Sequence, residues 1–178
     1  MTRGLSVTLV LTFALLPEAV HVRGVPSQTE PRHRPQFAYD VSRGCFDIDV
    51  YSVNNAQTEV LSVTMDLNRE KLPTEKRPLV VDLARPPKGT EVQVHVYQTA
   101  KHDWPCTDVS FWGAEEPTTW VAKRGTLTVV AVPPTVNQSE YPVIVRLVNA
   151  EFAGPSGATI RPSKTLEIKT VAGRMVGG

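Results

Sequence analysis

Alternation of apolar and polar side chains along several short segments is the feature that most constrains the fold of this chain. In one segment Val92, Val94 and Val96 are separated by polar residues, which is the period of a β-strand with one buried face. Segments with this alternation, or with a short β-branched and apolar run, are 46–51, 61–67, 79–83, 92–97, 109–111, 125–132, 141–148 and 166–168.

Turn-forming residues separate these segments, and no long helical pattern interrupts them. Asn, Pro and Gly pairs or clusters occur at 54–55, 86–89, 133–134 and 154–157. Strands with one apolar and one polar face are typical of antiparallel sheets that pack face to face. The sequence therefore predicts an all-β antiparallel β-sandwich of about 7–9 strands, immunoglobulin-like or jelly-roll-like.

An apolar run near the start of the chain indicates export. Residues 7–16 are almost entirely apolar and follow Arg3, which is the pattern of a cleaved secretory signal. The run is shorter than the ~20 residues that a membrane-spanning helix needs. We expect a secreted or periplasmic protein. Its predicted parts are a signal peptide (1–24), a flexible linker (25–40), the β-sandwich domain (41–170) and a frayed tail (171–178).

The chain has two cysteines, Cys45 and Cys106. An exported protein meets an oxidising compartment, where a lone pair of cysteines is more often a disulfide than a metal or redox site. We expect a Cys45–Cys106 disulfide that staples the domain.

Charge gives no indication of a polyanionic partner. The chain has 19 Lys and Arg against 18 Asp and Glu. Such a balance argues against nucleic acid or an anionic membrane surface as the partner. The expected partner is an unknown protein or a polysaccharide, without a membrane span.

Sequence motifs for catalysis and cofactor binding are absent. The chain has no zinc-protease motif, P-loop or dinucleotide fingerprint, and no catalytic residue, cofactor or metal site is predicted. A small secreted hydrolase remains an alternative, with His102 and either Asp103 or Asp108 as its groups. The carboxylates of Asp47 and Asp49 alternate along one strand, which is the ordinary solvent face of a sheet rather than a calcium site.

All three tryptophans fall in one short stretch, at Trp104, Trp112 and Trp120, with Asp103 and Asp108 close by. Tryptophan faces stack on the C–H side of a pyranose and carboxylates accept its hydroxyl hydrogen bonds. This set predicts a carbohydrate-binding module as one alternative. The other interpretation is that the tryptophans fill the core beside the disulfide.

The function favoured by the sequence is an exported, non-enzymatic β-sandwich that acts by binding or as a structural component of the envelope or exterior. Asn137 lies in a glycosylation sequon, which predicts an exposed loop between two strands.

Overall fold

The computed structural model describes residues 34–45, 48–66, 72–100, 116–132 and 140–173, and it confirms the predicted all-β, antiparallel class. Nine strands form in this part of the chain, together with one short helical turn, η2. Their bounds are β1 Val41–Gly44, β2 Ile48–Val53, β3 Glu59–Met65, β4 Leu79–Asp82, β5 Thr90–Val96, β6 Thr118–Ala131, β7 Glu140–Ala153, η2 Pro155–Gly157, β8 Thr159–Ile160 and β9 Leu166–Gly173.

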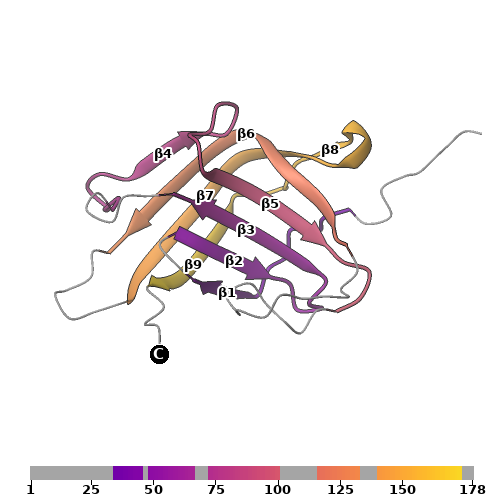
Figure 1. The fold of residues 1–178 in the computed structure, drawn as a ribbon, viewed down its shortest axis with the longest axis horizontal. Coiled ribbons are helices and arrows are strands. Elements are labelled where there is room, and N and C mark those ends of the chain that lie inside the picture. Colours follow the sequence, from indigo (N-terminus) through magenta and orange to yellow (C-terminus); the bar gives the residue numbers. More distant parts are fainter. Residues whose placement is uncertain (1–33, 46–47, 67–71, 101–115, 133–139, 174–178) are drawn as a thin grey trace, which may run out of the picture.

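All nine strands belong to one hydrogen-bonded sheet. Seven of them follow one another in the order β1-β2-β3-β5-β6-β7-β8. Two further strands join the long central hairpin, since β4 also pairs with β6 and β9 also pairs with β7. The first part of β6 pairs with β5 and its last part with β4, so this strand serves two regions of the sheet. In Figure 1, β2, β3 and β5 run across β7 and β9. The single sheet is therefore strongly bent, so that its early and late strands cross.

The sheet folds back until its last strand approaches its first. The Gly173 N–H donates to the Cys45 carbonyl oxygen over 2.9 Å, immediately after β1. The approach of the two backbones requires glycine at position 44, because a Cβ there would lie 2.5 Å from the Val171 carbonyl oxygen. The main apolar core cluster draws buried residues from β2, β3 and β5 and from β6, β7 and β9.

The bend of the β6–β7 hairpin lies at Gly125. Pairing between the two strands shifts register between Ala122 and Thr126, which marks a bulge. Gly125 has φ +113°, and a Cβ on it would lie 2.7 Å from the Cα of Ala150. A bulge increases local twist and bends a strand, so the β6–β7 hairpin bends at this position.

The structure extends several of the predicted strands and places the ends of the domain differently. The segment 109–111 lies outside the described residues, whereas β1 and β8 were not predicted. Residues 34–40, expected in the linker, pack against the sheet, and Pro35 and Phe37 are buried. At the other end, residues 171–173 continue β9 rather than belonging to a frayed tail.

Candidate functional site

Of the residues predicted to bind sugar, the described part of the chain includes Trp120. Trp104, Trp112, Asp103 and Asp108 lie outside the described residues. Trp120 is buried, with 1% of its surface exposed, and belongs to the main core. Its ring packs so closely on Gly154 that a Cβ there would lie 2.8 Å from the ring atoms. Trp120 therefore lies in the core, as the second interpretation of the tryptophans predicts. It is too buried to stack on a ligand at the surface.

Two adjoining hollows lie instead around the turn that joins β2 to β3. The larger has a volume of about 320 Å³ and the smaller about 120 Å³. Asn54 lines both. The larger is lined by Arg34, Gln36, Asn54, Thr58, Glu59, Val96, Tyr97 and Gln98, and is called the strap hollow below. The smaller is lined by Val41, Arg43, Tyr51, Val53, Asn54, Asn55 and Gln57.

A buried carboxylate, Glu59, forms part of the wall of the strap hollow. It is 2% exposed and is the first residue of β3. Its register partner is Val96, a core residue, so the Glu59 side chain lies on the inward-facing side of the sheet. An ionised side chain is costly to bury unless hydrogen bonds replace its water.

Those hydrogen bonds all come from the segment Arg34–Asp40, called the strap below. The backbone N–H groups of Gln36 and Phe37 donate to Glu59 Oε2 and Oε1 over 2.7 and 2.9 Å. The Tyr39 hydroxyl donates to Oε1 over 2.7 Å. Burial, followed by the nearby carboxylate charge, raises the pKa of Tyr39 far above its usual value, so this tyrosine stays a donor. Glu59 thus fixes a segment whose backbone has few strand partners of its own.

An apolar anchor complements this polar one. Phe37 has φ +56° and is 7% exposed, and its ring lies 5.3 Å from the ring of Phe152, centroid to centroid. The left-handed backbone conformation is unfavourable for a phenylalanine and persists because the surrounding contacts hold it. The strap is therefore held by one buried ring and one buried carboxylate.

The turn between β2 and β3 is held by the side chain of Asn54. Its Oδ1 accepts the N–H groups of Thr58 and Glu59 over 2.8 and 3.0 Å, and its Nδ2 donates to Thr58 Oγ1 over 3.1 Å. Asparagine commonly closes a turn in this way. The wall that the two hollows share is consequently set in place before any ligand binds.

The smaller hollow contains a polar atom without a partner among the described residues. Gln57 has φ +57°, and its Oε1 is buried and accepts no hydrogen bond. Tyr51 lines the same hollow; burial raises its pKa, and the Arg43 side chain partly opposes that shift. A volume of this size suits water or a small ion rather than an organic ligand.

A second apolar cluster lies on the opposite side of β2 and β3 from the main core. It comprises Cys45, Tyr51, Val53 and Val60, with Tyr97 packed against it. Alternation places Tyr51 and Val53 on the outer face, since Val50 and Val63 face inward in the same register. Tyr97 therefore belongs to the wall of the strap hollow and to this outer cluster at once.

Two further titratable groups of the outer face, His95 and Asp49, each lie beside a threonine hydroxyl. His95 Nδ1 lies 3.0 Å from Thr119 Oγ1, and burial lowers the pKa of this histidine. Burial raises the pKa of Asp49, while the hydrogen bond from Thr64 acts against that shift. Within the described ranges, no group of three or more His, Cys, Asp or Glu side chains could hold a metal ion.

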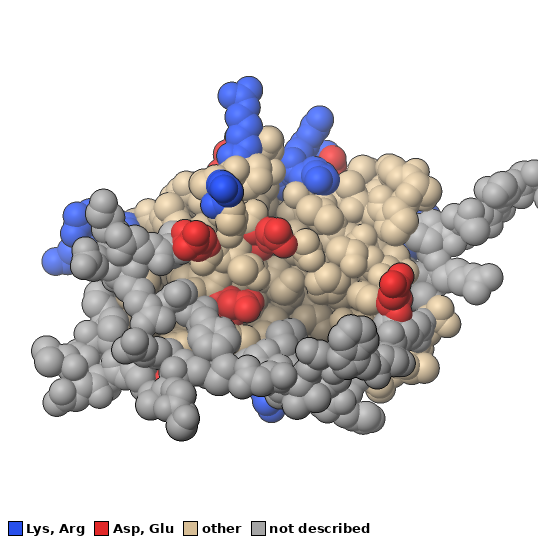
Figure 2. Space-filling view, viewed as in Figure 1, with Lys and Arg blue, Asp and Glu red and all other residues tan. Residues whose placement is uncertain are grey.

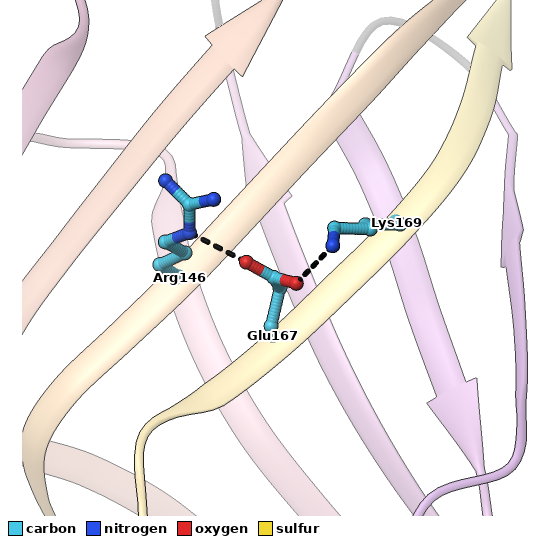
Figure 3. A network of polar contacts seen from close by, with 3 residues as sticks. All are labelled: Arg146, Glu167 and Lys169. Atoms are coloured by element: carbon cyan, nitrogen blue, oxygen red, sulfur yellow. Dashed lines mark hydrogen bonds and ion pairs between the residues drawn. The ribbon is translucent and has the colours of Figure 1, made fainter.

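Charged side chains of both signs lie on the described surface. Figure 2 shows acidic side chains spaced over the visible face, with Lys and Arg gathered along its upper margin. On the outer face of β7 and β9, Glu167 lies 2.5 Å from Arg146 and 2.6 Å from Lys169 (Figure 3). Hydrogen bonds from Lys169 and then Arg146 lower the pKa of Glu167. These exposed pairs are worth less than about 1 kcal/mol each and define no binding site.

Comparisons with known proteins assign no function to this site. The chain matches no protein-family model, no curated protein and no solved structure. In the part of the chain that the structure describes, no helix is long and apolar enough to cross a membrane.

Sequence reasoning missed both Glu59 and Tyr97. A signal for Glu59 was present: Leu61, Val63 and Met65 are the inward residues of β3, and position 59 has the same phase. A carboxylate on the inward phase of a strand is either satisfied by hydrogen bonds or functional. Tyr97 carried no comparable signal, because it follows the end of its strand.

Proposed function

We propose that this protein is an exported, non-enzymatic binding domain, secreted or periplasmic, that holds a small polar ligand in the strap hollow. The observation that supports the proposal is a polar hollow whose wall is preset by the buried Glu59 and by the Asn54 turn. Small-molecule sites are usually preformed concavities with a few convergent polar groups. The envelope or the exterior is where the apolar start of the chain would direct it.

Binding is favoured over catalysis by the chemistry of the lining. None of the eight described residues that line the hollow is His, Cys or Ser, so these residues supply no pair of nucleophile and imidazole base. Its one carboxylate, Glu59, already accepts three hydrogen bonds from the strap. The small hydrolase built on His102 remains an alternative on residues outside the described structure.

The proposal is tested by filling the strap hollow. Gln98 is exposed and lines it, so Gln98→Trp should occupy the space without disturbing the core. The matched control is Gln93→Trp, which changes the same residue type on β5 away from the hollow. We expect a thermal-shift screen of sugars, amino acids and small anions to find a ligand that stabilises the wild type and the control but not Gln98→Trp. A panel that stabilises none of the three proteins, or all three equally, would contradict the proposal.

The disulfide belongs to the same proposal. Cys45 is 9% exposed in the outer apolar cluster, and Cys106, its proposed partner, lies outside the described residues. We expect peptide mapping without reductant to find the two cysteine peptides joined, and to find them separate after reduction. Alkylation of both thiols in the unfolded, unreduced protein would contradict the pairing. Exported proteins retain such bonds because their compartment is oxidising.

The finer description of the fold is also part of this proposal. An immunoglobulin-like or jelly-roll-like sandwich is supported by two halves of the sheet that enclose one apolar core. A disulfide at Cys45 would then anchor a loop beside the outer face of β2 and β3.

A further inference from the structure

We infer that the strap hollow binds one sugar ring, either as a free monosaccharide or as the terminal unit of a glycan. The inference rests on the proposed function and adds the chemical class of the ligand. Four properties of the lining lead to it: its charge, its polar groups, its aromatic side chain and its volume.

The charges of the lining favour a neutral ligand. Among the eight described residues that line the hollow, Glu59 is the acidic one and Arg34 is the basic one, so the formal charges of these eight cancel. A site for an anion or for an amine would be expected to carry an excess of the opposite charge. The carboxylate is also engaged already, because three donors of the strap bind it.

The uncharged polar groups suit hydroxyl groups. Gln36, Asn54, Thr58 and Gln98 all line the hollow, and amide and hydroxyl side chains can both donate and accept hydrogen bonds. Sugar hydroxyl groups have the same double capacity. A carboxylate has about four acceptor positions and the strap occupies three, so Glu59 can accept one further hydrogen bond from a sugar hydroxyl.

Tyr97 supplies the apolar surface that a sugar ring needs. Its side chain is half-buried, packs against the outer cluster and lines the hollow beside Val96. An aromatic ring with an apolar body and a polar tip can lie against the C–H face of a sugar while its neighbours bind the hydroxyl groups. Packing against the cluster restricts this ring before the ligand arrives, which reduces the entropy lost on binding.

The volume limits the ligand to one ring. At about 320 Å³, the strap hollow is at the small end of the range of roughly 300–1,000 Å³ for small-molecule sites. A longer glycan would therefore enter by its end and leave its remaining units in solvent.

The test is calorimetric titration of the mature, oxidised protein with three kinds of compound. These are neutral hexoses and N-acetylglucosamine, the zwitterion glycine, and inorganic phosphate. We expect at least one neutral sugar to bind the wild type. Tyr97→Leu, which keeps an apolar side chain without the ring, should lower the affinity for that sugar tenfold or more. Gln98→Ala should lower it by a smaller factor. Oligosaccharides that carry the bound sugar only at one end distinguish a terminal unit from a free monosaccharide.

The outcomes separate the inference from the proposed function. Binding of glycine or phosphate, but not of sugars, with Gln98→Trp abolishing it, would overturn the sugar inference and leave the proposed function standing. Sugar binding that Tyr97→Leu and Gln98→Ala leave unchanged would overturn the inference, since the sugar would bind elsewhere. Failure of every compound to bind would contradict both. Thr64→Ala, on the exposed outer face of β3, is the control variant.

Discussion

Replacing Gly125 by alanine should destabilise the protein by about 3–5 kcal/mol, the sum of an unfavourable backbone conformation and overpacking. Its φ of +113° is unfavourable for an L side chain, and the new Cβ would lie 2.7 to 2.9 Å from backbone atoms of Asn149 and Ala150. Backbone atoms cannot move aside as the end of a flexible side chain can. The expected fall in melting temperature is roughly 6–20 °C, at about 2–4 °C per kcal/mol.

Gly157→Ala is the matched control for this substitution. Gly157 also has a positive φ, +77°, but nothing lies within 4 Å of the place where its Cβ would be. It should therefore show only the backbone component, about 1–2 kcal/mol. Chemical denaturation of the two variants measures the difference. Equal losses of stability would mean that the close approach of β6 and β7 at the bend is not as described.

Glu59→Ala should destabilise the protein by about 3 kcal/mol. The substitution removes three hydrogen bonds to a charged acceptor and leaves the Gln36 and Phe37 N–H groups to find water. We expect the strap to detach before the sheet unfolds, because Glu59 is its polar anchor. Hydrogen exchange at Gln36 and Phe37 should then become faster than exchange in β3 and β5.

The control is Glu91→Ala, a glutamate on the exposed face of the neighbouring strand β5. A surface substitution of this kind should change stability by no more than about 0.5 kcal/mol. If Glu59→Ala had an effect as small as that of Glu91→Ala, the carboxylate would not be the anchor of the strap.

Local alternation was enough to predict most of the strands and most of their inward-facing residues. The valines of β5 at positions 92, 94 and 96 are all buried, as their period requires. Trp120 is buried as well, and its register partner in the structure, Val94, also faces the core. Its nearness in sequence to Trp104 and Trp112 left a surface cluster as the alternative to the core.

The bend and the closure of the sheet could not be read from local pattern. Gly125 resembles the start of a strand, whereas in the structure β6 runs through it from Thr118 to Ala131. The contact between Gly173 and Cys45 joins residues far apart in the chain, and no period in the sequence encodes it. The strap was predicted to be a linker for a related reason: Phe37 stands alone, and its burial depends on Glu59 and Phe152.

The claim that the strap hollow is the binding site is tested most directly by amide chemical shifts of the isotope-labelled mature protein. The titrants are neutral hexoses, N-acetylglucosamine, glycine and phosphate at millimolar concentrations. The account predicts that one of them shifts the amide signals of Thr58, Glu59, Tyr97 and Gln98, while the outer face around Thr64 and Glu91 stays unchanged. Shifts confined to that outer face, or no shift with any of these compounds, would contradict it.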